Sequence, residues 1–156
     1  MGGDIVNQVE LKMALSKHLV DVEESYQEFL EDLYPNPSKE KNEIADLLRN
    51  YIIKLEELVG GDLVTDEALP CVIIGSSVEL SDLTTNQVLN YKIVTPFNGI
   101  KEFTNVSFLS PVGRKLLMKK PGEQVSINVP AGVLNYSLLA VKPNYNDILT
   151  PFYSKH

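Results

Sequence analysis

The chain has 156 residues, 44% of them hydrophobic, which is enough to build one domain or two small ones around a buried core. Its net charge of −7 comes from residues 1–59, which carry 13 acidic and 6 basic side chains, whereas residues 60–156 carry 8 of each. An acidic N-terminal half disfavours nonspecific binding to nucleic acid or to an anionic membrane, and we expect neither a membrane partner nor sequence-specific nucleic-acid binding.

The chain contains one cysteine, Cys71, which excludes an internal disulfide bond and a cysteine metal cluster. The N-terminus lacks the basic and then apolar pattern of a signal peptide, and the apolar runs are too short to span a membrane. We therefore expect a cytoplasmic protein with no intrinsic metal and no cofactor.

Residues 5–33 are expected to form one long helix, because apolar residues recur at intervals of four and three. A second helix is expected to run to about Val59, where Gly60 and Gly61 end it. The first apolar seam consists of Leu15, Leu19, Val22, Tyr26, Phe29 and Leu33. The second consists of Ile44, Leu48, Tyr51, Leu55 and Leu58.

A proline-rich turn over residues 34–38 breaks the first helix. Asn36 can cap the second helix with Pro37 in its first turn, and Ser38 is the alternative cap. Two complementary seams joined by a short turn predict an antiparallel hairpin. So thin a structure, with one buried seam, indicates either that its tip must reach another molecule or that the chain forms a homodimer through its helices.

From Cys71 onward the apolar period changes to two, which is typical of strands. Strands are expected at residues 72–80, 88–94, 103–108, 124–129 and 136–141. The pattern predicts an α+β fold in which an antiparallel sheet with one short helix follows the hairpin. The expected divisions are 1–60 for the hairpin, 61–70 for a linker and 71–156 for the second domain. In the tail, docking on the sheet is expected of Ile148, Leu149, Phe152 and Tyr153.

The short helix is expected between the third and fourth strands. Ser110 can cap its N-terminus and Pro111 suits its first position. Lys119 and Lys120 are placed at its C-terminal end, where the helix dipole favours cations, and Pro121 follows.

The segment SPVGRKLLMKKPGE, which begins at Ser110, resembles S-P-L-G-R-x-L-L-G-K-K-x-G-D in the C-terminal domain of the Gre transcription factors, GreA and GreB. Further matches to the family, in the family's order and spacing, cover residues 72–141. They are IGSSV at 74–78 to F-G-S-x-V, YKIV at 91–94 to Y-x-I-V, and Pro130, Gly132 and Tyr136 to P-G-G-x-x-x-Y. The family's acidic loop after Y-x-I-V is absent, and residues 95–99 stand in its place.

The resemblance implies that the second domain is similar to FK506-binding proteins. It also implies a loop that docks on RNA polymerase, formed by Ser110, Pro111, Val112, Gly113 and Arg114. A helix cap followed by a surface arginine is the alternative interpretation of the same residues.

The family's hairpin enters the secondary channel of RNA polymerase, where an Asp and a Glu at its tip help to hold a catalytic Mg²⁺. Here KEKNEI, beginning at Lys39, resembles the tip sequence K-E-N-A-E-Y, which places Glu40 at the Glu position. Pro37 falls on the Asp position and cannot bind metal, so Glu31 or Asp32 across the turn would have to substitute. Glu43 is the fourth acidic residue of the tip. The arm is about one heptad shorter than in the cleavage factors, a loss of roughly 10 Å in reach.

The resemblance thus predicts a factor, not itself an enzyme, that binds RNA polymerase at its secondary channel and modulates elongation, with weak or no stimulation of transcript cleavage. Two alternatives stay open. One is a prolyl isomerase on the FK506-binding-like fold, although the chain has no Trp to floor such a pocket. The other is an FK506-binding-like or helix-mediated interaction module that does not act on polymerase. For the tip acids, the simpler interpretation is that Glu40 favours the dipole of its helix.

Overall fold

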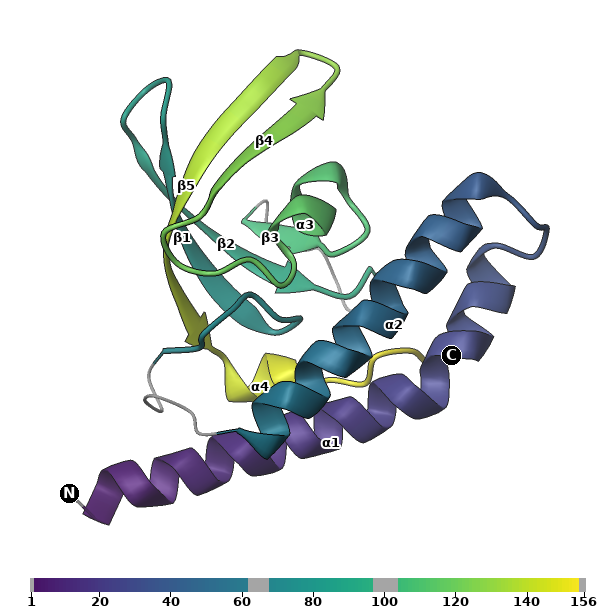
Figure 1. The fold of residues 1–156 in the computed structure, drawn as a ribbon, viewed down its shortest axis with the longest axis vertical. Helices are drawn as coiled ribbons and strands as arrows, with labels where there is room; N and C mark the ends of the chain where they lie inside the picture. Colours follow the sequence, from purple (N-terminus) through teal and green to yellow (C-terminus); the bar gives the residue numbers. More distant parts are fainter. Residues whose placement is uncertain (1, 62–67, 97–103, 155–156) are drawn as a thin grey trace.

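The structure of the chain is a computed structural model that describes residues 2–61, 68–96 and 104–154. Two long helices precede a curled five-stranded sheet (Figure 1). The helices are α1 (Gly2–Leu33), α2 (Lys39–Gly60), α3 (Pro111–Leu116) and α4 (Tyr145–Ile148). The strands are β1 (Ser76–Asp82), β2 (Val88–Val94), β3 (Asn105–Ser107), β4 (Gln124–Val129) and β5 (Gly132–Pro143).

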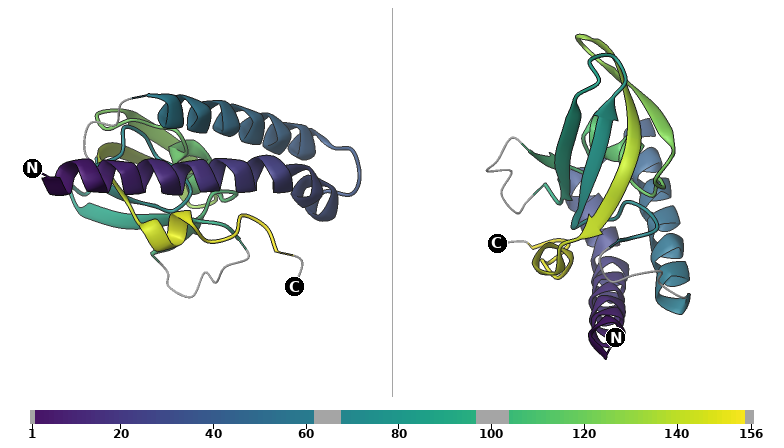
Figure 2. Two further views of the ribbon diagram at one scale, coloured as in Figure 1. Left: turned by 90° about the horizontal axis from the view of Figure 1, so that it is seen from below. Right: turned by 90° about the vertical axis from the view of Figure 1, so that its left-hand side faces the viewer.

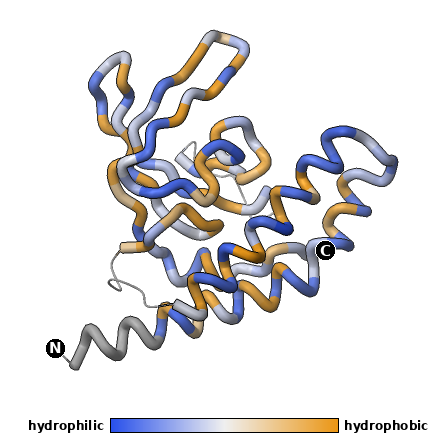
Figure 3. Tube along the Cα trace, viewed as in Figure 1, coloured by the Kyte–Doolittle hydropathy of each residue, from blue (hydrophilic) through white to orange (hydrophobic). Residues whose placement is uncertain are grey.

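The two long helices lie side by side and antiparallel, as the seams predict (Figure 2). All five seam residues of α2 are buried, and Figure 3 shows apolar positions interspersed with polar ones along α2 and the coloured part of α1. Ser38 Oγ accepts a hydrogen bond from the backbone N–H of Lys41 at 3.0 Å, so α2 begins at Lys39. The placement of the cap at Asn36 was therefore wrong, and the alternative cap is the one used.

The sheet has the order β3-β2-β1-β5-β4 and is mixed rather than wholly antiparallel. Strands β2 and β3 run parallel, with Lys92 opposite Asn105 and Val94 opposite Ser107. The expectation of a purely antiparallel sheet was therefore wrong. Residues 97–103, including the predicted strand residue Phe103, lie outside the described residues.

Strand β1 begins four residues later than the alternation predicts. Val72, Ile73 and Ile74 are all buried instead of alternating. The backbone of Val72 bonds to the segment after α3, accepting from Met118 N at 2.8 Å and donating to the carbonyl of Lys119 at 2.9 Å. The apolar run therefore fills the core as an irregular segment, and the strand starts only after Gly75, whose φ is +96°.

Helix α3 is shorter than expected. Met118 has a φ of +70°, a left-handed conformation that stops the helix before the predicted stop at Pro121. Lys119 and Lys120 consequently follow the helix, and its last turn carries Arg114 and Lys115 instead. The sequence also did not indicate α4, the second short helix.

One continuous hydrophobic cluster joins the long helices to the sheet. Phe29 of α1 and Tyr51 of α2 are fully buried and contact the second half of the chain. The hairpin therefore lies along the β domain, and the expectation of a thin arm with one buried seam was wrong. The tail contributes the buried Ile148 and Phe152, whereas Leu149 is 46% exposed. Within the described residues, no helix has both the length and the apolar character needed to cross a bilayer.

Candidate functional site

The loop before α3 is held by hydrogen bonds within a few residues. Ser110 Oγ donates to the carbonyl of Ser107 at 2.7 Å and accepts from the N–H of Gly113 at 3.0 Å. This is the predicted N-cap, with Pro111 exposed at the first helical position. Gly113 is packed so closely on Ser107 that a Cβ atom would lie 2.0 Å from its carbonyl oxygen. The loop is thus a closely packed platform that presents Pro111 at the surface, with Arg114 half-buried three positions later.

The side chain of Arg114 turns toward the hairpin. Its Nη2 atom lies 2.8 Å from Oε1 of Glu40, 74 residues earlier in the chain. Tyr34, in the turn between the long helices, belongs to the same group, since partial burial and the charge of Glu40 raise the pKa of its hydroxyl while Arg114 lowers it. The structure therefore joins one residue of the predicted docking loop to one residue of the predicted tip.

The other tip acids are distributed between different partners. Oε1 of Glu31 lies 2.8 Å from the ammonium nitrogen of Lys41, across the turn. Asp32 accepts a hydrogen bond from the hydroxyl of Tyr153 in the tail. Glu43 is exposed on the first turns of α2. In the part of the chain that the structure describes, no group of three or more His, Cys, Asp or Glu side chains is placed to hold a metal ion.

A second polar group lies deeper, where α1, α2 and the start of the sheet meet. Nε2 of His18 lies 2.7 Å from the Tyr51 hydroxyl, which accepts the N–H of Ile74 at 2.9 Å. Burial lowers the pKa of His18 from its ordinary 6.5 to about 4, against smaller opposing effects of Asp21 and the Ile148 backbone. Sequence reasoning found no role for His18; its position beside the seam residue Leu19 was the one available signal.

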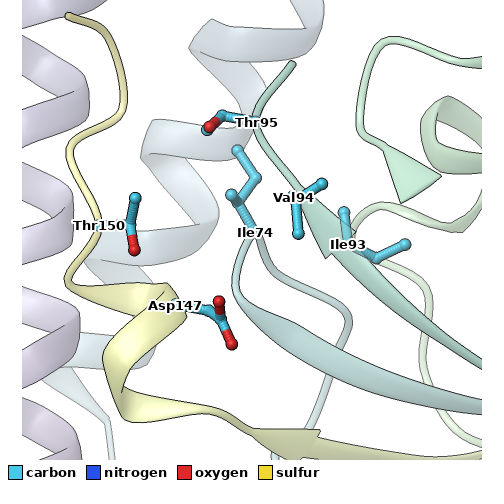
Figure 4. Close-up of a pocket in the computed structure, with 6 residues that line it drawn as sticks. All are labelled: Ile74, Ile93, Val94, Thr95, Asp147 and Thr150. Atoms are coloured by element: carbon cyan, nitrogen blue, oxygen red, sulfur yellow. The ribbon is translucent and has the colours of Figure 1, made fainter. Parts of the chain in front are cut away.

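A cavity of about 50 Å³ lies between the sheet and α4 (Figure 4). Its lining consists of Ile74, Ile93, Val94, Thr95, Asp147 and Thr150. Ligand pockets usually measure about 300–1,000 Å³, and this space suits a water molecule or two. It offers no place for a proline-containing peptide, so it gives the prolyl isomerase alternative no support.

Residues 67–143 match the family model described as transcription elongation factor, GreA/GreB, C-terminal. Transcription elongation factor GreA of Caldanaerobacter subterraneus subsp. tengcongensis is 36% identical over 105 residues, which cover 65% of this chain and 66% of that protein. GreA of Thermosipho africanus is 34% identical over 112 residues, 70% of this chain and 68% of that protein. The chain belongs to the GreA/GreB family. This confirms the family resemblance and the α+β fold class that the sequence predicts.

A solved structure of a GreA/GreB transcription elongation factor from Nitrosomonas europaea has the same fold. It superposes with a TM-score of 0.52 at 25% identity, covering 79% of this chain and 94% of that one. The chain spans about two thirds of the length of the curated GreA relatives reported above. The family model covers β1 to β5 and α3, and it ends at Pro143, before α4 and the tail.

Proposed function

We propose that this GreA/GreB-family chain binds RNA polymerase at its secondary channel and modulates transcription elongation. The observation that carries the proposal is family membership over the segment that contains Ser110–Arg114. The capped, close-packed geometry of this loop supports a docking role, because a rigid surface loses little conformational entropy on binding. In this proposal the chain is cytoplasmic and is not itself an enzyme, since any transcript cleavage is carried out by the polymerase. A homodimer through the helices stays a prediction.

We further propose that the chain occupies the channel with weak or no stimulation of cleavage. Mg²⁺ is held by several oxygen ligands, so a tip that completes its coordination needs correctly placed carboxylates. Pro37 stands where the family pattern has Asp, and the two nearest acids across the turn, Glu31 and Asp32, each contact another side chain of the chain. Of the two metal-holding positions in the family's tip pattern, only the Glu position is matched here, by Glu40, and Glu40 pairs with Arg114.

The docking loop is tested by the affinity of purified polymerase for the double variant Pro111→Ala, Arg114→Glu. We expect binding to weaken by about tenfold or more, because arginines at the centre of an interface often contribute more than 1 kcal/mol. Lys115→Glu is the matched control, since it makes the same charge change on the next, exposed residue. Equal binding by the double variant and wild type would show that the loop assignment is wrong.

Arg114→Glu also removes the pair with Glu40, so a charge swap separates the two effects. The variant Glu40→Arg, Arg114→Glu restores an internal ion pair while leaving an acid at the docking position. If polymerase contacts Arg114 directly, the charge-swapped variant should bind polymerase as poorly as Arg114→Glu alone. Recovery of wild-type affinity would assign the loss to the internal pair instead.

The cleavage question is tested on a stalled, backtracked transcription complex. We expect the purified chain to slow nucleotide addition without shortening the transcript. Rapid shortening that Glu40→Ala or Asp32→Ala abolishes would refute the channel-occupying version and establish a cleavage factor.

A further inference from the structure

The chain continues past the family-matched residues into a segment that binds the hairpin. Residues 144–153 leave the end of β5, form α4 and then run beside α1 (Figures 1 and 2). Ile148 and Phe152 are fully buried in this segment. Its contacts therefore connect the far end of the chain to the first helix.

The apolar part of this connection is a cluster of three phenylalanines from three parts of the chain. The ring centroid of Phe152 lies 5.0 Å from that of Phe29 on α1 and 5.8 Å from that of Phe108, which follows β3. Phe29 and Phe108 are 5.9 Å apart, and all three rings are fully buried. Tyr153 adds an edge contact to Phe29 at 5.8 Å. The tail thus fills the junction between the hairpin and the β domain.

Two hydrogen bonds fix the direction of the segment along α1. The backbone N–H of Phe152 donates to Oδ2 of Asp21 at 2.7 Å, and the hydroxyl of Tyr153 donates to Asp32. Asp32 is one of the tip acids, so the tail reaches the part of the hairpin that is proposed to enter the polymerase.

The tip is also held from the other side. Glu40 pairs with Arg114, and the two side chains are 54% and 30% exposed. Exposed ion pairs contribute little and exchange readily, whereas burial of aromatic rings is a strong and persistent interaction. The buried phenylalanine cluster therefore holds the hairpin in place, and the Glu40–Arg114 pair forms because the hairpin is held there.

We propose that residues 144–153 are a strap that keeps the chain in a closed state, in which the hairpin tip and the Ser110–Arg114 loop bind each other instead of polymerase. This inference rests on the proposed function. Arg114 cannot pair with Glu40 and with a polymerase carboxylate through the same edge at once, so binding through this residue requires the Glu40–Arg114 pair to break, and the strap favours the pair by keeping the tip beside the loop. A partner that needs the open state binds with an apparent affinity reduced by the open fraction.

The strap is tested first without polymerase, by the distance between spin labels on two exposed positions, Asn36→Cys in the turn and Asn128→Cys on β4. Cys71 is buried and stays unlabelled. We expect one narrow distance distribution for the otherwise wild-type chain. Phe152→Ala should add a second, displaced population, and an unchanged distribution would overturn the strap.

Asp21→Ala combined with Tyr153→Phe is the milder second variant, because it removes both strap hydrogen bonds and leaves the three phenylalanines in place. Glu24→Ala is its control, an exposed acid one turn along α1. Should Phe152→Ala fail to fold, which circular dichroism shows directly, the milder pair decides. A displaced population in the pair but not in Glu24→Ala supports the strap, and its absence from both overturns it.

Polymerase binding then tests whether the closed state is inhibitory. If the open state is about 10% populated, releasing the strap should tighten the apparent affinity by up to about tenfold. Suppose that the strap variants show the displaced population but bind polymerase no more tightly, while Arg114→Glu weakens binding. This result would overturn the inhibitory role of the closed state and leave the proposed function standing. If neither wild type nor any variant binds polymerase, the proposed function fails and the closed state is not inhibitory. The spin-label distances still decide, in that case, whether residues 144–153 hold the hairpin against the β domain.

Discussion

The hydroxyl oxygen of Tyr51 on α2 bonds to α1 and to the segment before β1, so Tyr51→Phe tests how these three segments are held together. The oxygen contacts Nε2 of His18 and accepts the N–H of Ile74, and all three residues are buried. Phenylalanine keeps the ring and its packing and removes this oxygen alone. The substitution leaves a buried backbone N–H and a buried ring nitrogen without their common partner.

Each buried polar group that loses its partner costs about 1–3 kcal/mol, so the loss of two partners in Tyr51→Phe should lower the free energy of unfolding by about 2–6 kcal/mol. For a chain of this size, one kcal/mol corresponds to about 2–4 °C in Tm, so the thermal midpoint should fall by roughly 4–24 °C. Urea unfolding followed by far-UV circular dichroism measures the free energy, and a thermal scan measures Tm.

Tyr26→Phe is the matched control, because the contact of its hydroxyl with the side chain of Gln27 is long, at 3.4 Å, and exposed. This variant should unfold within about 0.5 kcal/mol of wild type. Equal stability of Tyr51→Phe and Tyr26→Phe would refute the argument that the buried hydroxyl joins the hairpin to the sheet.

Two further predictions follow from buried contacts. Between pH 6.5 and about 4, His18 is protonated in the unfolded chain but stays neutral in the folded one, because burial lowers its pKa. The free energy of unfolding should therefore be unaffected by His18 above pH 6.5 and should fall by roughly 3 kcal/mol toward pH 4. Urea midpoints measured across this range should decline less steeply for His18→Leu than for wild type, and parallel declines would contradict the assignment. Gly113→Ala must push α3 away from Ser107, so it should lower the free energy of unfolding in urea by about 1–3 kcal/mol. Gly60→Ala is the control: it has open space around it and should be neutral or slightly stabilising. Equal effects of the two variants would count against the close packing of the loop.

The helices could be predicted because their signals are local. Apolar spacing of four and three specifies one face of a helix, and the two prolines of residues 34–38 end the first helix wherever the rest of the chain lies. The cap of α3 was predictable for the same reason, since Ser110 bonds to a residue three positions later. In the turn, Asn36 and Ser38 both suit a cap, and choosing between them required the geometry of the backbone.

The arrangement of the hairpin could not be predicted, because it depends on contacts between residues far apart in the chain. The apolar spacing that places Phe29 in the seam is the same whether water or another part of the chain covers its ring. In the structure the ring is covered by Phe152, 123 positions later. The same limit hid the parallel pairing of β2 with β3, since alternation does not encode the direction of a neighbouring strand. Family resemblance did not supply the missing contact either, because the tail lies beyond the matched residues.

The length of the hairpin connects these observations. Helix α2 has 22 residues and so rises about 33 Å, and Glu40 near its start lies beside Arg114. One more heptad in each arm would carry the tip about 10 Å farther, well beyond the reach of an ion pair at 2.8 Å. A short arm therefore loses reach and gains the ability to contact its own domain, and both effects have the same geometric cause. The tail makes that self-contact persistent, since Phe152 contributes the burial that an exposed ion pair lacks.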